Sequence, residues 1–292
     1  MSGGSQETVR EALAYGASEL GDSRIPNARR DAELLLIRCT GLTRTDLFAH
    51  PEAALGFDQS SRYRELLAKR KAQEPIQYIL GEREFHGLRF AVDPGVLIPR
   101  PETEHLVEAA LERIPLHSTM RVADVGTGSG AIAVALAFAR PVSEVTALEI
   151  SPVALRVAES NAAAHAVAGR IRFLESDLLD AVQEEKFDMV VSNPPYIADA
   201  ERESLDVEVR DYEPATALFA GPTGLEIYER LIPQAARGLR PDGWLLMEIG
   251  AGQRSQIEPL LADWREVGFI ADHQGIARVV VARAPRIDGP HP

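Results

Sequence analysis

The sequence predicts an α/β protein with two parts, a small N-terminal helical domain and a larger domain built on a doubly wound parallel sheet. Few β-branched residues occur before Ile76, whereas short apolar runs alternate with helical patterns after Met120. A chain of 292 residues is long enough for each part to bury a core. We expect residues 1–77 to form the helical domain, 78–101 a hairpin connector and 102–292 the sheet domain.

The composition is that of an ordinary globular protein, with 45% hydrophobic and 26% charged residues. The formal net charge is −13, and residues 1–98 are nearly neutral, so the acidity lies in the later part. This excess of negative charge disfavours non-specific binding to the phosphate backbone of a nucleic acid, and we expect no direct nucleic-acid binding. The single cysteine, Cys39, excludes an internal disulfide and a thiolate metal cluster. The scattered histidines predict no metal site.

The sequence contains no candidate membrane span. The longest apolar run, 131–139, is far shorter than the roughly 20 residues that a span requires. The first residues also lack the basic and apolar regions of a signal peptide. We therefore expect a cytoplasmic protein.

Three segments near the N-terminus have helical periodicity. Apolar residues recur at helical spacing over 8–20 and 28–40, and Gly41 is placed to end the second helix. A third helix is predicted over 58–73, before Pro75. The pattern indicates a bundle of three to five helices, whose role is either substrate docking or stabilisation.

After the predicted helices the sequence pattern changes from helical periodicity to strand-like alternation. Residues 84–92 alternate around a turn glycine, as in a short hairpin. Pro99 and Pro101 then prevent regular structure, and Thr103 opens a helix. Arg100, between the two prolines, either approaches an active site or forms a structural salt bridge, and the sequence leaves both open.

Strands and helices alternate in the remainder of the chain. Strands are predicted over 121–125, 144–150, 170–174, 187–191, 244–249 and 277–281, with helices over 129–139 and 152–166. Because short buried strands separated by helices form a parallel sheet, we expect ligands at the carboxyl ends of these strands.

A glycine-rich loop, DVGTGSG at 124–130, lies between the first of these strands and its helix. Glycines let a ligand approach the main chain and the helix N-terminus. Glu149 ends the next strand, where a carboxylate accepts hydrogen bonds from ribose hydroxyls. The loop alone fits S-adenosylmethionine or NAD, since Ala131 completes the dinucleotide pattern. Asp124 favours the former, because it would repel a pyrophosphate and suits a cationic ligand.

A second acidic residue, Asp177, follows the third strand of the sheet. It is placed to reach the amino group of an adenine, with Leu178 packing against the ring. The alternative is that Asp177 caps a helix. Beside the glycine loop and Glu149, the adenine role is favoured.

The tetrapeptide Asn193-Pro194-Pro195-Tyr196 directly follows the strand at 187–191. The prolines fix the backbone and lack N–H donors, so the Asn193 side-chain oxygen and the Pro194 carbonyl remain as acceptors. Two rigid acceptors suit the two hydrogens of an NH2 group, and they raise the electron density on a poorly nucleophilic nitrogen. The Tyr196 ring can lie over the planar substrate group. An ordinary proline turn is the alternative that this position and the glycine loop disfavour.

The combination resembles the amino-methyltransferases with a (D/N)-P-P-(Y/F) motif, and nearly the whole chain resembles the release factor glutamine methyltransferases among them. The resembling segments are Gly81–Phe85, Leu97–Glu104, Val209–Pro214, Ala217-Leu218 and Gly221–Gly224. The resemblance implies a Rossmann-like methyltransferase sheet. It also implies transfer of a methyl group from S-adenosylmethionine to the side-chain amide nitrogen (N5) of the glutamine in the Gly-Gly-Gln loop of peptide chain release factors.

The resemblance also favours substrate docking as the role of the helical domain at 1–77, and it implies the site residues. The cofactor is expected at Gly126, Thr127, Gly128, Ser129, Gly130, Glu149, Asp177, Leu178 and Asn193. The substrate glutamine is expected at Asn193, Pro194, Pro195 and Tyr196, of which Asn193, Pro194 and Tyr196 are the catalytic residues. Two residues depart from the family pattern: Leu178 stands where an aromatic residue often flanks the adenine, and Ala277 where an acid is common.

Two other functions stay open at this point. The same tetrapeptide serves methyl transfer to an adenine or cytosine amino group of a nucleic acid. A non-catalytic cofactor-binding protein is the third hypothesis. The acidic later part and the segment 97–104 favour a protein substrate, and the intact loop with Glu149 and Asn193 disfavours a loss of catalysis.

Overall fold

A computed structural model describes residues 6–285, and these fall into two units. One unit contains the described residues up to Gly81 together with Asp206–Tyr212. The other contains Glu82–Leu205 and the described residues from Glu213 onward. The domain edges expected at residues 77 and 101 differ from this division, which keeps the whole hairpin with the sheet and assigns a short later segment to the helical unit.

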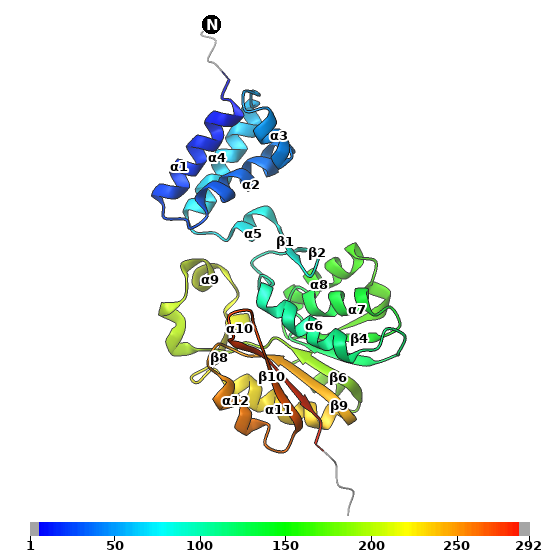
Figure 1. The fold of residues 1–292 in the computed structure, drawn as a ribbon. Helices are drawn as coiled ribbons and strands as arrows, with labels where there is room; N and C mark the ends of the chain where they lie inside the picture. The colour runs from blue at the N-terminus through cyan, green and yellow to red at the C-terminus, as the bar shows by residue number, and fades with distance from the viewer. Residues whose placement is uncertain (1–5, 286–292) are drawn as a thin grey trace, which may run out of the picture. The chain divides into compact units, whose positions relative to one another are not determined.

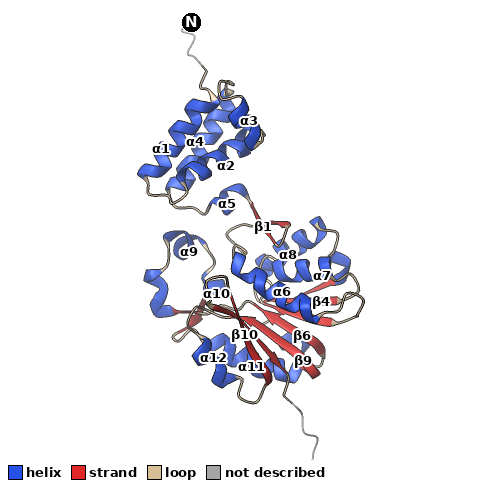
Figure 2. Ribbon diagram, viewed as in Figure 1, coloured by secondary structure: helices blue, strands red, loops and turns tan. Residues whose placement is uncertain are grey.

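The first unit is helical, as predicted (Figure 2). Its helices are α1 (Val9–Asp22), α2 (Ala28–Thr40), α3 (Arg44–Ala49), α4 (Phe57–Lys71), α5 (Ile76–Leu80) and α9 (Val207–Tyr212). Thr8 begins α1 with a capping box that includes Glu11. Gly41, at φ +73°, ends α2 in the left-handed conformation that the sequence indicates.

The helical unit holds the segment 206–212 through a buried arginine. Arg70 of α4 donates to Asp31 at 2.8 Å and to Glu208 at 2.5 Å. The Tyr212 hydroxyl donates to the Ala72 carbonyl at 2.5 Å. Only 3% of Arg70 is exposed, and the Asp31 side chain is 6% exposed, so this ion pair is shielded from water. The sequence does not predict this attachment, because its partners lie more than 100 residues apart.

The second unit contains a sheet of seven strands within the described residues, in the order β10-β11-β9-β6-β3-β4-β5 (Figure 1). The strands are β3 (Arg121–Val125), β4 (Glu144–Glu149), β5 (Ile171–Glu175), β6 (Phe187–Ser192), β9 (Leu239–Glu248), β10 (Arg265–Ala271) and β11 (Ala277–Arg283). Strands β5, β4, β3, β6 and β9 are parallel, whereas β11 is antiparallel to both β9 and β10. The doubly wound sheet is confirmed; the edge strand β10 was not predicted.

Helices cover both faces of this sheet (Figure 1). One face packs against α6 (Glu104–Arg113), α7 (Ala131–Ala139) and α8 (Pro152–Ala164), and the other against α11 (Glu226–Gly238) and α12 (Arg254–Leu260). Side chains alternate accordingly along β3: Val122 joins the first core and Ala123 the second. None of the helices in residues 6–285 is long and apolar enough to cross a membrane.

The hairpin of β1 (Glu82–Phe85) and β2 (Leu88–Ala91) belongs to the sheet unit rather than to a free connector. Phe85 and Phe90 are 1% and 0% exposed and share the core of α6 and α7. Asn161 of α8 accepts from the Ala91 N–H at 2.8 Å and donates to its carbonyl at 3.0 Å. Two buried aromatic rings and this paired amide fix the hairpin to the sheet unit.

The remaining elements are short. They are the short strands β7 (Ile197–Ala198) and β8 (Phe219–Gly221), the helix α10 (Ala215–Leu218) and the 3-10 turns at Pro101–Thr103, Ala168–Arg170, Asp180–Val182 and Asp199–Ser204. Strand β3 lies between β4 and β6, where the order of the sheet reverses. Open α/β sheets bind ligands at this point.

Candidate active site

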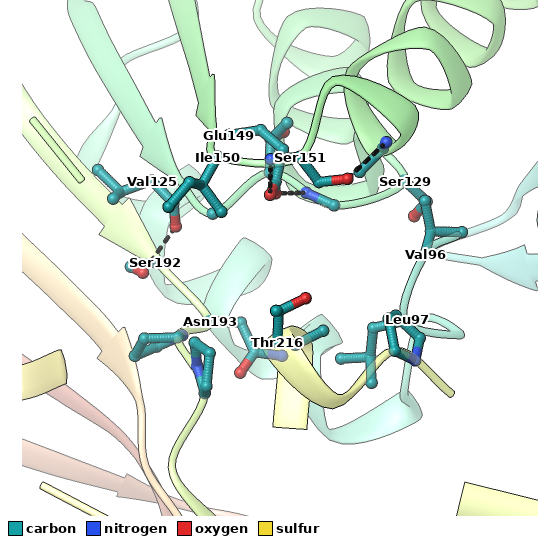
Figure 3. A pocket seen from close by; sticks show the side chains of 18 of the residues that line it. Val96, Leu97, Val125, Ser129, Glu149, Ile150, Ser151, Ser192, Asn193 and Thr216 are labelled. Atoms are coloured by element: carbon teal, nitrogen blue, oxygen red, sulfur yellow. Dashed lines mark hydrogen bonds between the residues drawn. The ribbon is translucent and has the colours of Figure 1, made fainter. Parts of the chain in front are cut away.

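A cavity of about 320 Å³ lies at the carboxyl ends of β3, β4 and β6 (Figure 3). Its lining comes from segments that are distant in sequence: residues between Gly95 and Thr103, between Val125 and Ile132, Glu149–Ser151 with Ala154, Ser176–Leu178, Ser192–Pro195, residues between Pro214 and Phe219, and Ile227 with Arg230. In Figure 3, Glu149, Ile150 and Ser151 lie on one side of the cavity, opposite Asn193 and Thr216.

The three glycines of the loop at 124–130 have two roles, ligand access and helix packing. Gly126, Gly128 and Gly130 have φ values of +72°, +56° and +80°, in the left-handed region. A Cβ at Gly126 or Gly128 would meet no described atom within 4 Å, so these backbones are open to a ligand. A Cβ at Gly130 would lie 3.0 Å from the Ala158 Cβ. Gly130 does not line the cavity; it lets α7 pack closely against α8.

Glu149 joins the glycine loop to the start of α8. Its Oε2 accepts from the Gly128 N–H at 2.9 Å, and its Oε1 accepts from the Ser151 N–H at 3.0 Å. Each carboxylate oxygen keeps a further lone pair, and the side chain lines the cavity. This set of acceptors fits the two hydroxyls of a ribose, as the sequence predicts for this position.

Asp124 lies beneath the loop rather than against the ligand space. Its Oδ2 accepts from the Thr127 hydroxyl at 2.6 Å and from the Ala133 N–H at 3.1 Å. The residue is 0% exposed, and its Oδ1 has no hydrogen-bond partner among the described residues. Burial raises the pKa of Asp124 to about 7. The expectation that this carboxylate faces a cationic ligand is therefore wrong, because the residue does not line the cavity.

Asp177 and Leu178 line the cavity on the β5 side. The Asp177 carboxylate pairs with Arg230 at 2.6 Å, and Arg230 also lines the cavity. Leu178 has a φ of +52°, and the Ser176 hydroxyl stabilises this turn by donating to the Leu178 carbonyl at 2.9 Å. Asp177 thus forms an ion pair at the cavity edge.

The tetrapeptide follows β6 and brings acceptors to the opposite wall. The Ser192 hydroxyl donates to the Val125 carbonyl at 2.7 Å, which ties the end of β6 to the end of β3. Asn193, Pro194 and Pro195 line the cavity. The Asn193 Nδ2 donates to the Thr103 hydroxyl at 3.1 Å. The Asn193 side chain is therefore held on its NH2 side.

Tyr196 does not line the cavity, in contrast to the expectation that its ring covers the substrate. Its ring packs against the core of α11 and α12, and its hydroxyl donates to Glu248 at 3.4 Å. Burial raises the pKa of the Tyr196 hydroxyl well above its ordinary value. Gln253 donates to the Tyr196 carbonyl at 2.9 Å, and Gly224 passes so close that a Cβ there would lie 2.6 Å from the same oxygen. In this structure Tyr196 supports the tetrapeptide from behind.

For Arg100 the sequence leaves open an approach to the active site or a structural salt bridge, and the structure shows both. Arg100 lines the cavity, and its guanidinium donates to Glu213 at 2.5 Å. The other oxygen of Glu213 accepts from the Ile98 N–H at 3.3 Å. The side chain of Glu213 is 1% exposed, so the pair is buried on one side. Ile98 and Arg100 are thus joined to Glu213 at the cavity wall.

Three residues at this site were missed from the sequence: Thr103, Glu248 and Gln253. Thr103 was predicted only to open a helix, and its partners lie 90 and 145 residues away. Glu248 lies within a predicted strand, and a charged residue between Met247 and Ile249 is a signal that could have marked it. Nothing in the local sequence marks Gln253.

Solved structures with a similar fold include methyltransferases. The hMettl16 catalytic domain in complex with MAT2A 3′UTR hairpin 6 is 19% identical, with a TM-score of 0.56 over 78% of this chain and 84% of that one. A methyltransferase from Pyrococcus furiosus is 17% identical, with a TM-score of 0.50 over 77% of this chain and 100% of that one. At this identity the likeness shows a shared fold.

Family models and curated relatives match most of the chain. Residues 11–81 match the PrmC N-terminal domain, and residues 101–210 match the methyltransferase small domain. The release factor glutamine methyltransferase of Koribacter versatilis (strain Ellin345) is 44% identical over 95% of this chain and 99% of its own length. The enzyme of the same name from Geobacter sulfurreducens is 42% identical over 94% of this chain and 96% of its own length. The chain belongs to the release factor glutamine methyltransferase family.

Proposed function

We propose that this protein transfers a methyl group from S-adenosylmethionine to the side-chain amide nitrogen (N5) of the glutamine in the Gly-Gly-Gln loop of peptide chain release factors, in the cytoplasm. Membership of the family supports this substrate. The observation that carries the proposal is that Asn193, Pro194 and Pro195 line the same cavity as Gly128 and Glu149. A nucleoside-binding wall thus faces a wall of rigid acceptors.

The first wall suits S-adenosylmethionine, which supplies an electrophilic methyl group when it is bound. The open backbones of Gly126 and Gly128 let a ligand approach closely, and Thr127 and Ser129 complete the loop. Glu149 offers acceptors for the ribose hydroxyls. We assign Asp177 and Leu178, on the β5 side of the cavity, to the adenine. Gly130 supports the loop through its contact with α8.

The second wall suits the primary amide of glutamine. The amide nitrogen is a poor nucleophile because its lone pair is delocalised into the carbonyl. The Asn193 side-chain oxygen and the Pro194 carbonyl accept its two hydrogens and orient the nitrogen for attack. Acceptors that are already in place stabilise the positive charge that develops on nitrogen. The proton leaves after transfer, so no charged general base is required beforehand.

The helical unit, on the same proposal, docks the protein substrate. Its match to the PrmC N-terminal domain supports a role within this family. A glutamine side chain alone offers few contacts, so recognition of a whole release factor requires surface outside the cavity. Stabilisation of the catalytic unit is the other role that such a domain could have.

The proposal is tested by methyl transfer from radiolabelled S-adenosylmethionine. Three acceptors are offered separately: purified release factor, its Gln→Ala variant in the Gly-Gly-Gln loop, and bulk nucleic acid. We expect label on the intact factor and none on the other two. Label on nucleic acid alone would keep the chemistry and overturn the substrate. No label on any acceptor, with the cofactor bound, would favour a binding protein.

A further inference from the structure

A chain of hydrogen bonds links Asn193 to a buried carboxylate that does not reach the cavity. Asn193 Nδ2 donates to Thr103 Oγ1 at 3.1 Å, and the Thr103 hydroxyl donates to Glu248 Oε2 at 2.6 Å. Thr103 and Glu248 are 4% and 2% exposed. Thr103 lines the cavity but Glu248 does not, so any influence of Glu248 on the reaction passes through another residue.

The ionised carboxylate fixes the direction of both hydrogen bonds. A carboxylate only accepts, so the hydrogen of the Thr103 hydroxyl points toward Glu248. The Thr103 oxygen is then free to accept, and it takes a hydrogen from the Asn193 NH2. None of the described residues donates to Asn193 Oδ1. This oxygen therefore stays available as an acceptor, which is what a substrate NH2 group requires.

We propose that Thr103 and Glu248 are positioning residues that orient the Asn193 carboxamide, so that its oxygen rather than its NH2 group meets the substrate amide. The inference rests on the proposed function, because only an NH2-bearing substrate needs an acceptor at this place. A carboxamide turned the other way would direct its own N–H donors at those of the substrate. Such an arrangement neither binds nor activates the nitrogen.

Protonation of Glu248 on Oε2, the oxygen that faces Thr103, reverses the hydrogen-bond chain. A neutral carboxyl group donates to Thr103, and the Thr103 hydroxyl then donates to Asn193, whose amide turns over to accept. Burial, the largest cause, raises the pKa of Glu248 to about 7. The Thr103 hydrogen bond, the Tyr196 hydroxyl and Arg278 lower it, whereas the Glu102 carboxylate raises it. The reversal therefore falls within the pH range in which the enzyme can be assayed.

Two tyrosines and an arginine–aspartate ion pair around Glu248 keep their protonation near neutral pH. The Tyr196 hydroxyl donates to Oε1 of Glu248 at 3.4 Å, and the Tyr228 hydroxyl donates to the backbone carbonyl of Glu248 at 3.0 Å. Burial raises the pKa of both tyrosines above the ordinary value, so both stay neutral. Arg278 pairs with Asp272 at 2.8 Å, which holds the pKa of Asp272 low and that of Arg278 high.

The first test compares Thr103→Val with Thr103→Ser at saturating cofactor and release factor. Valine preserves the shape of threonine but offers Asn193 no acceptor, whereas serine keeps the hydroxyl. We expect kcat to fall at least about tenfold in Thr103→Val and to stay within about threefold of wild type in Thr103→Ser. The Kd of S-adenosylmethionine, from calorimetry, should be the same in both. Equal kcat values in the two variants would overturn the proposal.

The second test follows kcat between pH 6 and 8.5. The wild type is expected to lose activity on the acid side, with a midpoint near the pKa of Glu248. The Glu248→Gln variant cannot titrate at this position, so the acid-side midpoint should disappear even though the maximal kcat is reduced. Retention of the same midpoint in Glu248→Gln would assign the titration to another group and contradict the reversal.

The third test does not depend on turnover. The side-chain NH2 signals of Asn193 are identified by their absence in Asn193→Asp, and are followed by 1H–15N correlation spectra of the full chain without release factor. They should shift with pH in the wild type and stay constant in Glu248→Gln. A protein that methylates no release factor but shows this titration would refute the proposed substrate alone. Identical titrations in both proteins would refute the positioning role alone.

Discussion

Asn193 is the residue on which the proposed chemistry depends most directly, because its side chain is the acceptor that can be removed without changing the backbone. We expect Asn193→Ala to lower kcat by about 100-fold or more, as the loss of one preorganised partner does in other enzymes. The Kd of S-adenosylmethionine should change little, since we assign the nucleoside contacts mainly to the glycine loop and Glu149. Single-turnover methylation and calorimetry measure the two quantities. Near-normal turnover would refute the role of Asn193.

The buried carboxyl group of Asp124 makes the free energy of unfolding fall as the pH rises, which is the opposite of the usual effect of an aspartate. Burial raises its pKa from 3.8 to about 7, so the folded chain keeps a proton that the unfolded chain loses above pH 4. Its contribution to the free energy of unfolding is therefore complete below about pH 4 and is lost as the pH rises toward 7. An asparagine at this position has no such dependence.

We therefore expect Asp124→Asn to become more stable relative to wild type between pH 5 and pH 7.5. The gain is at most about 1.4 kcal/mol per pH unit. Urea unfolding at the two pH values measures this gain in the free energy of unfolding. The contributions of all other titratable groups cancel in the difference between the two proteins. A difference that is the same at both pH values would contradict a raised pKa for Asp124.

The residues of the site differ in how far the sequence could predict them. Gly128, Glu149, Asp177 and Asn193 line the cavity because each follows or ends a parallel strand, and strand ends can be found from apolar runs. Tyr196 was assigned to the substrate by its neighbours in sequence, but its side chain points to Glu248. Tertiary contacts decide the direction of a side chain, and no local pattern contains them.

At the scale of elements, helix ends with a capping signal were the most predictable. The helix α2 runs over Ala28–Thr40, as predicted, because Gly41 ends it. The helix after the glycine loop starts at Ala131 rather than Ser129, because Gly130 is left-handed. The strand β10 was missed because its sequence, REVGFIA, mixes charged residues and a glycine with apolar ones, and none of its seven residues is fully buried.

The packing of α7 against α8 depends on Gly130. A Cβ there would lie 3.0 Å from the Ala158 Cβ and 3.1 Å from its Cα, at a φ of +80°. Gly275 has the same φ of +80° and no described neighbour within 4 Å, so it serves as the matched control. We expect Gly275→Ala to cost about 1 kcal/mol from backbone strain alone. Gly130→Ala should cost about 1–3 kcal/mol more, because helix backbone must shift.

Thermal or urea unfolding measures the loss of stability in both variants. The difference between them is the cost of the close contact with Ala158, because the backbone strain is common to both. Cofactor binding provides a second measure, since a displaced α7 also moves the glycine loop, to which we assign the cofactor. Gly130→Ala should weaken the binding of S-adenosylmethionine, whereas Gly275→Ala should not. Equal losses of stability in the two variants would mean that α7 and α8 adjust to the extra methyl group without cost.

At the scale of the whole molecule, Arg70 is central to the helical unit. Its removal leaves Asp31, whose side chain is 6% exposed, as an unpaired buried charge. We expect Arg70→Ala to destabilise this unit by about 3–5 kcal/mol. Arg62→Ala on the same helix is the control, because Arg62 pairs with Glu65 in an exposed bridge, and such bridges contribute less than about 1 kcal/mol.

Limited trypsin digestion checks the same prediction locally. Loss of Arg70 removes the bond to Glu208, so cleavage after Arg210 should become faster in Arg70→Ala than in wild type. Arg62→Ala should be cut at the wild-type rate. Unchanged cleavage in Arg70→Ala would show that the Tyr212 hydroxyl, through its bond to the Ala72 carbonyl, is sufficient to hold the segment.

The segment 206–212 means that the helical unit is not an independent module of the chain. Within the described residues the polypeptide passes between the two units after Gly81, after Leu205 and after Tyr212. A truncated chain that begins at Glu82 would therefore carry α9 without Arg70 and Ala72, the residues that bind it. An exchange of N-terminal domains between relatives would likewise need to include these seven later residues. Inheritance of substrate preference in such chimeras should follow both pieces together.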